Sequence, residues 1–547
     1  ATAFLSYGQA VHGSIVGTVT DSTGGVLAGA KLSITDLGRD VNVKTTSNDS
    51  GNFSQRFLIA GRYRIRVEAA GFKTYVQDNI VVSVDNESRV DIAMQVGDVT
   101  QTLEVTAESS VLKTERSDVS TTWSDKTIIN IPVLNRKFTN FQLMTPGVVA
   151  FPTSATAPAP ENPRGAYRML VNGQSFAGTS HLLDGTDNHD AVLGWLVINP
   201  TLESVTEAKI TTANYDAEFG VASAGVVSAQ TKSGTNALHG SAFEYLRNNV
   251  MQARNPFTQS RVIPGSNGKT IPLTQWNQFG GSIGGAIIKN KLFYFGDFQG
   301  SRRNTGGGAL LRVPSAVERG GDLSSLNVPI YDPRSGATPA TRTRFPGDII
   351  PASQLSSQSQ NLLKLIPLPN ASAILDQPNF ASSGGVKYDD ESFTGRVDHF
   401  TTDKLHIFGR YTMQQFRILA PGSYGVAGGG GLDASGSIAA FAGKSDTRNQ
   451  SIAAGFDYAV RPNLLTDFRF GWVRYKLFVQ PNGIGSAPAK DAGIPGLNVD
   501  DNFTSGMPGF FINGYGSGGS IPFRFGYALG VNGCNCPLIQ DEKQAQF

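Results

Sequence analysis

Cysteine and histidine are scarce in this sequence of 547 residues, which contains two cysteines and six histidines. Cys534 and Cys536 are separated by one residue, so a disulfide between them would be strained. Two thiolates need further ligands to hold a metal ion, and the flanking residues supply none. No histidines have the HExxH spacing of a zinc peptidase. We therefore predict no metal site and no cofactor, and the cysteines are either oxidised in an exported loop or an ordinary loop pair.

Long apolar runs and charge are also in short supply. No stretch of about 18 consecutive apolar residues is present, which excludes a transmembrane helix, so a membrane could be crossed only by a closed β-barrel. The 46 basic and 44 acidic residues give a net charge of +2 without a basic run, so nothing attracts nucleic acid. There is no GxSxG, no P-loop and no defensible pair of catalytic carboxylates. We expect neither an enzyme nor a nucleic-acid partner.

Glycine and aromatic residues are abundant instead, with 63 glycines, 32 phenylalanines and 15 tyrosines. This composition favours strands and turns. A single core stops growing at about 250–300 residues, so several domains are expected. The chain changes character at Gly234, within residues 202–246. A small mixed domain precedes this point, and segments that alternate polar and apolar residues follow it, as in membrane β-strands.

Residues 1–11 contain a short apolar run followed by the small residues Gly8 and Ala10. This pattern is typical of the end of a secretory signal peptide. We expect a signal-peptide remnant here, with a flexible N-terminus as the alternative.

Within residues 12–97, period-two alternation occurs in four runs, at 14–20, 30–34, 63–68 and 89–94. Ile65 and Val67 lie on the face opposite Arg64 and Arg66, which predicts a half-buried antiparallel sheet. The turn motifs are more specific: Gly17-Thr-Val-Thr-Asp21, Asp49-Ser-Gly51-Asn-Phe53, Gly61-Arg-Tyr63 and Ala70-Gly71-Phe72. With these motifs the segment resembles the carboxypeptidase regulatory-like, transthyretin-like β-sandwich. The resemblance implies a non-catalytic domain with a weak link to carbohydrate binding.

Residues 98–123 form a polar linker. Within it one segment resembles the TonB box, by which an outer-membrane transporter is gripped from the periplasm: Thr102, Leu103, Glu104, Val105, Thr106 and Ala107. Such a segment must be able to add as a strand to the sheet edge of its partner. The alternative is that it forms the last strand of the sandwich.

Residues 124–235 resemble the plug domain of TonB-dependent transporters. The resemblance rests on the helix-like runs 128–136 and 138–147, ended by Pro146-Gly147, and on the glycine-rich close of the domain at 215–235. A sandwich ahead of a plug is the order found in the Oar-like group of this family.

The segment LLDGTDNHDA, within this predicted plug, offers oxygen atoms that could contact a ligand or an ion: those of Asp184, Asp187, Asn188 and Asp190. The spacing lacks the glutamate and glycine positions of an EF-hand loop. Because Asp-Gly is a common turn pair, a turn is the main expectation and ligand contact the alternative.

Residues 236–547 are predicted to form part of an outer-membrane β-barrel. Alternating strands are expected at 240–248, 278–286, 292–299, 393–400, 405–412, 451–458 and 465–474, and long loops near 301–390 and 417–447. Plugged transporters need about 22 strands, and this region offers about eight to ten of spanning length. We therefore expect a C-terminally incomplete chain.

The fold class predicted from the sequence is mainly β: a β-sandwich, a small α+β plug, and the first part of a transmembrane antiparallel barrel. The resemblance implies a TonB-dependent receptor or transporter in the cell outer membrane, with its sandwich in the periplasm. Its implied partners are a TonB-type protein, outer-membrane lipid, and an extracellular siderophore, glycan, peptide or protein. A non-transporting adhesin or carbohydrate-binding surface protein is the alternative.

Overall fold

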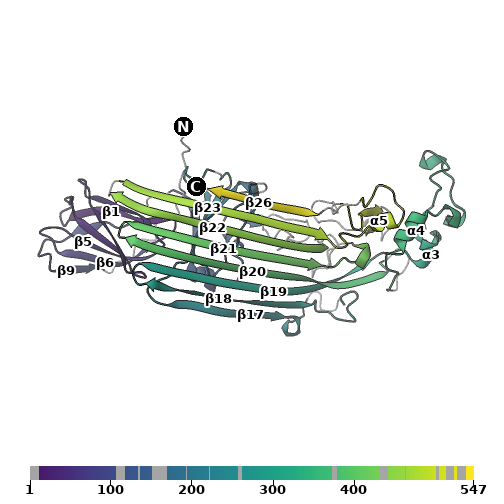
Figure 1. Cartoon of the computed structure of the whole chain (residues 1–547), viewed down its shortest axis with the longest axis horizontal. Coiled ribbons are helices and arrows are strands. Elements are labelled where there is room, and N and C mark those ends of the chain that lie inside the picture. The colour runs from purple at the N-terminus through teal and green to yellow at the C-terminus, as the bar shows by residue number, and fades with distance from the viewer. Residues whose placement is uncertain are drawn as a thin grey trace.

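The computed structural model describes residues 12–105, 117–133, 136–150, 169–191, 194–220, 222–254, 256, 262–371, 378–429, 442–461, 464–499, 504–512, 523–525 and 537–547. Residues 1–11, Thr106, Ala107, Cys534 and Cys536 lie outside this set, so the predictions made for them are not addressed. Strands dominate the described chain (Figure 1), and the predicted mainly β fold is confirmed. No helix in the described part is long and apolar enough to span a membrane.

The N-terminal sandwich consists of two packed sheets. One contains β4 (Asn52–Leu58), β1 (Gly13–Asp21) and β7 (Glu87–Arg89), with β8 (Ile92–Met94) also paired to β1. The other has the order β3 (Val41–Thr46), β2 (Lys31–Asp36), β5 (Gly61–Glu68), β6 (Thr74–Val82) and β9 (Thr102–Val105). Ile65 and Val67 are fully buried between the sheets, whereas Arg64 and Arg66 are exposed, as their alternation predicts.

The central unit, residues 117–235, follows the sandwich. Its sheet has the order β10 (Val119–Ser124), β15 (Val205–Ala213), β16 (Gly225–Thr231), β13 (Thr179–Leu183) and β14 (Thr186–Asp187). A separate pair is formed by β11 (Val148–Ala150) and β12 (Met169–Val171). Helix α1 (Asp125–Asn130) overlaps the predicted helical run 128–136 only at 128–130, whereas α2 (Thr139–Gln142) lies within the predicted run 138–147. Ser124 caps α1 by accepting a hydrogen bond from the Thr127 amide.

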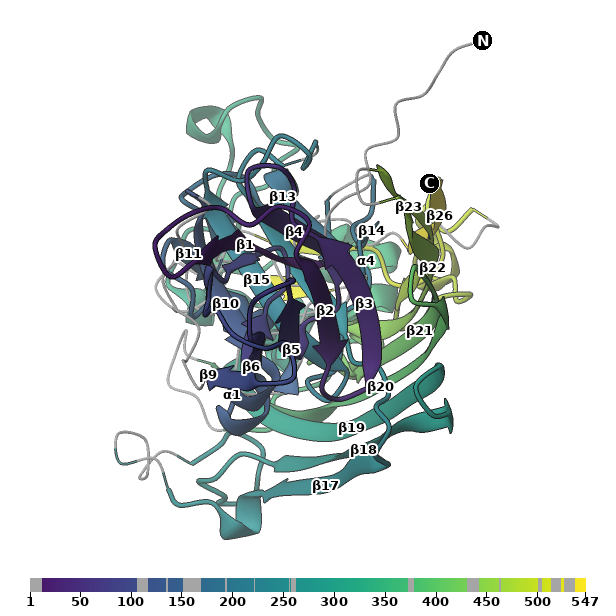
Figure 2. The same cartoon turned by 90° about the vertical axis from the view of Figure 1, so that its left-hand side faces the viewer.

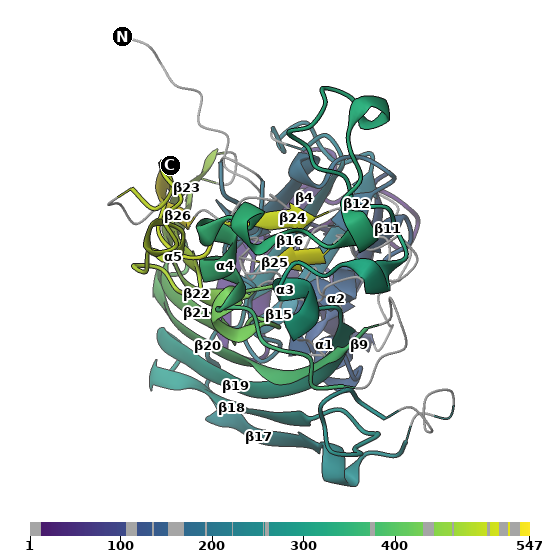
Figure 3. The same cartoon turned by 90° about the vertical axis from the view of Figure 1, so that its right-hand side faces the viewer.

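The third layer is one long antiparallel sheet, here called the wall. Within the described residues it has eight strands in the order β17 (His239–Asn248), β18 (Thr274–Ile288), β19 (Leu292–Leu311), β20 (Phe380–Thr402), β21 (Leu405–Ala420), β22 (Gly443–Arg461), β23 (Leu464–Pro481) and β26 (Leu538–Gln546). Each of the seven predicted barrel segments lies in one of these strands. The sheet curves around one side of the central unit without closing (Figures 2 and 3).

The two ends of the wall differ. At the end beside the sandwich, β20 and β21 are joined by Asp403-Lys404. At the other end lie the longer connections, which include α3 (Ala316–Arg319), α4 (Ser357–Leu363) and α5 (Pro488–Asp491), labelled in Figure 1, and β24 (Phe510–Ile512) and β25 (Phe523–Phe525), labelled in Figure 3. Short 3-10 turns occur at 176–178, 249–251, 324–326, 339–341, 346–348, 352–354 and 425–427. At this far end of the wall, the connections that follow β19, β21 and β23 share one core, which contains Leu311, Leu362, Tyr424 and Ala492.

The outer face of the wall changes from apolar to charged along β22. On β22 the outward residues near the sandwich are Ile452, Phe456 and Tyr458, and those farther along are Lys444, Asp446 and Arg448. The inward residues between them are small or polar. This distribution is that of a barrel strand whose apolar part meets lipid and whose other end extends beyond it.

Gly234 marks the passage from the central unit to the wall. A Cβ atom at this position would lie 2.3 Å from the carbonyl oxygen of Gly285 and 2.4 Å from that of Tyr294. Only glycine therefore fits where the chain passes against β18 and β19. The change of character seen in the sequence coincides with this steric requirement.

Candidate functional site

Asp184 lies at the tip of the hairpin formed by β13 and β14. Asp184 and Gly185 have φ values of 52° and 77°, so the expected Asp-Gly turn is present, with both residues in the left-handed region. The Asp184 carboxylate is buried and accepts hydrogen bonds from the amide and the hydroxyl of Thr231 at 2.8 and 2.9 Å. The turn is thereby tied to the end of β16.

Two arginines of the wall also converge on Asp184. Nη1 of Arg396 on β20 lies 2.8 Å from Oδ1, and Nε of Arg410 on β21 lies 2.7 Å from Oδ2. All three side chains are at most 2% exposed. A buried carboxylate shared by two guanidinium groups is strongly held, because each charge would be costly alone. Asp184 is thus an anchor between the central unit and the wall.

The other predicted ligand residues fasten the loop that follows. Asn188 donates to the carbonyl of Ile198 at 2.8 Å and accepts from its amide at 2.9 Å. Asp190 accepts from the Trp195 amide at 2.8 Å, and Asp187 pairs with His189. These side chains are engaged within the protein, so contact of Asp184, Asp187, Asn188 and Asp190 with an external ligand stays a prediction.

The sandwich meets the central unit through two residues of β15. Lys209 Nζ lies 2.7 Å from the carbonyl oxygen of Asp85, 2.8 Å from its carboxylate and 3.1 Å from that of Asp118. Glu207, two residues earlier on the same face, accepts a hydrogen bond from the amide of Val84 at 2.6 Å. Burial raises the pKa of Glu207 to about 7. The β6–β7 turn of the sandwich is therefore held by one ammonium group and one carboxyl group.

The sandwich also touches the rim of the wall. Asn236 donates to the carbonyl of Arg39 at 2.5 Å, and Asn290 donates to the carboxylate of Asp40 at 3.3 Å. Lys44 lies 3.8 Å from Asp403 in an exposed ion pair. The sandwich thus contacts both the central unit and the wall.

The described part of the candidate TonB box is strand β9. Thr102–Val105 pair in parallel with Thr74–Gln77 of β6, and β9 is the last strand in the order of that sheet. Leu103 and Val105 pack against the sandwich core. The predicted linker is thus not irregular throughout, because residues 102–105 join the sandwich and residues 119–123 begin β10 of the central sheet.

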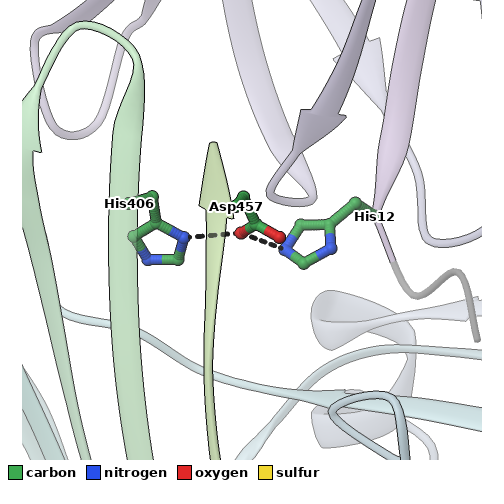
Figure 4. A group of neighbouring side chains, drawn as sticks. All are labelled: His12, His406 and Asp457. Carbon is green, nitrogen blue, oxygen red and sulfur yellow. Dashed lines mark hydrogen bonds and ion pairs between the residues drawn. The ribbon is translucent and has the colours of Figure 1, made fainter. Parts of the chain in front are cut away.

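A buried group of His12, His406 and Asp457 lies where the start of the sandwich meets the wall (Figure 4). Asp457 Oδ2 lies 2.9 Å from Nδ1 of His406 and 3.5 Å from Nε2 of His12. His406 Nε2 lies 3.0 Å from Asp398, which accepts two hydrogen bonds from Arg396. The group is therefore joined through Arg396 to the Asp184 anchor.

Comparison with known families bears directly on the wall. A family model described as an outer membrane beta barrel domain matches residues 230–547, more than half of the chain. The chain belongs to the outer-membrane β-barrel family. This outer-membrane β-barrel protein also matches the carboxypeptidase regulatory-like domain model over residues 14–95, which confirms the resemblance of its sandwich. The predicted location in the cell outer membrane is likewise confirmed.

Individual relatives of the β-barrel protein include transporters. The TonB-dependent transporter Oar of Myxococcus xanthus is 26% identical over 309 residues, which cover 54% of this chain and 27% of Oar. The outer membrane transporter YddB from Escherichia coli is 11% identical, with 78% of this chain and 44% of that one covered and a TM-score of 0.41. The siderophore receptor PiuA from Acinetobacter baumannii is 12% identical, with 78% and 52% covered and a TM-score of 0.32. The chain spans less than two thirds of each of these proteins.

Proposed function

We propose that this protein is a TonB-dependent outer-membrane receptor and transporter. In this proposal the central unit is the plug, residues 236–547 contribute wall strands, and the sandwich lies in the periplasm. The observation that carries the proposal is the anchoring of Asp184 by Arg396 and Arg410, which holds a separate domain against the inner face of a barrel sheet. The similarity to Oar supports the same function.

The position of β9 suggests how a TonB-type partner could engage. Among the described strands β9 is at the edge of its sheet, and an edge strand offers backbone groups to a further strand. A partner strand could therefore add beside Thr102–Val105 without first displacing them. Pulling on this strand would load the sandwich and, through Lys209 and Glu207, the plug.

The remaining steps follow from this arrangement. An external ligand of unknown class binds to the long connections at the far end of the wall and to the plug beneath them. The partner draws on the proton-motive force, the plug rearranges, and the ligand passes. The protein supplies binding and gating and performs no chemical conversion.

The proposal is tested by capturing the detergent-solubilised chain on the immobilised periplasmic domain of a TonB protein. Wild type and Val105→Ala should be retained, because both keep the backbone of β9. Val105→Pro should not be retained, because proline removes an N–H and disturbs strand pairing. Failure of the wild type to bind would contradict TonB-dependent transport and favour the non-transporting adhesin.

A further inference from the structure

The His12, His406 and Asp457 group has the arrangement of a metal-binding site. One ligand atom from each residue lies within 4.8 Å of the other two. These are the residue types that bind zinc and related ions, at about 2.0–2.2 Å from the metal. Figure 4 shows Asp457 between the two imidazole rings, with His12 approaching from the sandwich and His406 from β21. An ion among them would need only small movements of the side chains.

His12 is prepared for such a role. Its side chain is 6% exposed, and its Nε2 atom has no hydrogen-bond partner although it points at Asp457. A buried ring nitrogen without a partner is costly in an ordinary ionic network. Coordination of a cation would satisfy it.

His406 is oriented by its outer neighbour. Its Nε2 atom lies 3.0 Å from Asp398 Oδ1, so an N–H donated to that carboxylate leaves Nδ1 facing Asp457. Histidine ligands of metals commonly donate their second ring N–H to a carboxylate, which fixes the ring and makes it more basic. Asp398 therefore provides the usual support of a metal-bound histidine.

The cationic neighbours can be accommodated. Arg469 contacts Nδ1 of His12 at 3.2 Å and also donates to the carbonyls of Phe456 and Phe468 at 3.0 and 2.9 Å. When His12 binds a metal through Nε2, Nδ1 carries the proton, so Arg469 gives up this contact and keeps the two carbonyls. Arg469 pairs with Oδ1 of Asp457 and Arg396 pairs with Asp398, so Oδ2 of Asp457 is left to face the ion.

A cavity opens beside the same residues. It has a volume of about 60 Å³ and is lined by His406 and Asp457 of the wall, together with Tyr63 and Asp36 of the sandwich. One water molecule needs roughly 10–15 Å³ on this measure, so the cavity has room for the water that completes tetrahedral coordination.

We propose that His12, His406 and Asp457 bind a divalent transition-metal ion, Zn²⁺ in preference to Mg²⁺ or Ca²⁺, which fastens the start of the sandwich to the barrel wall. Two imidazoles and one carboxylate suit zinc, whereas the hard cations require mainly oxygen ligands. Such a clasp would join segments 394 and 445 residues apart in the chain, as the numbers of the three ligands give.

The test uses the full chain in detergent micelles, stripped of metal with a chelator and titrated with Zn²⁺ by calorimetry. We expect one Zn²⁺ per chain in the wild type. His12→Gln and His406→Gln should each weaken binding about 100-fold or more, because even the outer partners of zinc ligands contribute ~10–100-fold. His399→Gln removes a histidine from the same rim that bonds to Thr401 instead, and should bind as the wild type does.

Zinc-edge X-ray absorption on the wild type tests the ligand set without any substitution. Two imidazole nitrogens with oxygen neighbours are expected. Absence of Zn²⁺ binding, equal binding by all variants, or a shell of oxygen atoms alone would each overturn the proposal.

Discussion

The ammonium group of Lys209 lies 2.8 Å from the carboxylate of Asp85, and both side chains are at most 3% exposed. This ion pair joins β15 of the central unit to the sandwich. It differs from the pair between Lys44 and Asp403 at the rim, whose side chains are 71% and 64% exposed. The sandwich is thus attached by one buried and one exposed Lys–Asp pair, whose contributions to stability can be compared.

Replacing Lys209 with Met should lower the free energy of unfolding by about 3–5 kcal/mol, because Asp85 and Asp118 would stay buried without their cation. Lys44→Met should cost at most about 1 kcal/mol, since exposed pairs contribute little. Urea unfolding in detergent, followed by limited proteolysis between the sandwich and the central unit, measures both. Equal losses of unfolding free energy in Lys209→Met and Lys44→Met would contradict the expectation that the buried pair contributes more than the exposed one.

Glu207 should make this attachment pH-dependent. Its pKa is about 7 in the folded protein and 4.5 ordinarily, so between these values the folded state binds a proton that the unfolded state does not. Stability must then fall as pH rises from 4.5 through 7, by an amount on the order of a few kcal/mol. Glu207→Gln should remove this part of the profile, since its amide oxygen still accepts from Val84. The unfolding midpoints of the wild type and Glu207→Gln, measured across pH 4–8, test this expectation. Parallel pH profiles of the two proteins would contradict it.

Asp184→Asn should loosen the central unit from the wall. Arg410 would lose its carboxylate partner, whereas Arg396 would keep Asp398. A buried guanidinium group left without its counter-charge typically costs about 3–5 kcal/mol. Hydrogen exchange of β13 and β16 should become faster. Asp187→Asn is the control, because Asp187 lies three residues farther along and pairs with His189 of the following loop. This variant should leave the exchange of β13 and β16 nearly unchanged. Unaltered exchange in Asp184→Asn would show that the wall is held by other contacts.

Gly234→Ala should destabilise the passage between the central unit and the wall. The added methyl group would meet two backbone carbonyl oxygens that cannot move independently of their strands, and overpacking of this kind costs about 1–3 kcal/mol. Gly220→Ala is the control, because a Cβ atom there meets nothing within 4 Å. The yield of folded chain from detergent refolding and its melting temperature compare the two. If Gly234→Ala were as stable as the wild type, the chain at this position could move away from β18 and β19.

The sequence predicts strands well where alternation is unbroken, as at Ile65 and Val67. It does not reveal β3, β4 and β6, and for β4 and β6 the structure gives the reason. Phe57 and Asn79 have φ values of 59°, and at Asn79 the buried positions shift from Tyr75 and Gln77 to Ile80 and Val82. Such a bulge breaks the period-two pattern that identifies a strand.

The candidate site could be predicted only in part. The Asp-Gly turn at Asp184 is visible in the sequence because its signal is local. Its partners, Arg396 and Arg410, lie more than 200 residues away and have no spacing that links them to it. Lys209 likewise has the sequence context of an ordinary strand residue. Contacts between domains depend on docking, which local patterns do not encode.

The unequal attachment of the sandwich has a mechanical consequence. Under a load applied to β9, an exposed pair such as Lys44 with Asp403 yields before the buried pair of Lys209 with Asp85. The sandwich would then separate from the rim of the wall while it stays attached to the central unit, which the Asp184 anchor still holds to the wall. A metal ion bound by His12, His406 and Asp457 would determine how much force is needed to separate the sandwich from the wall.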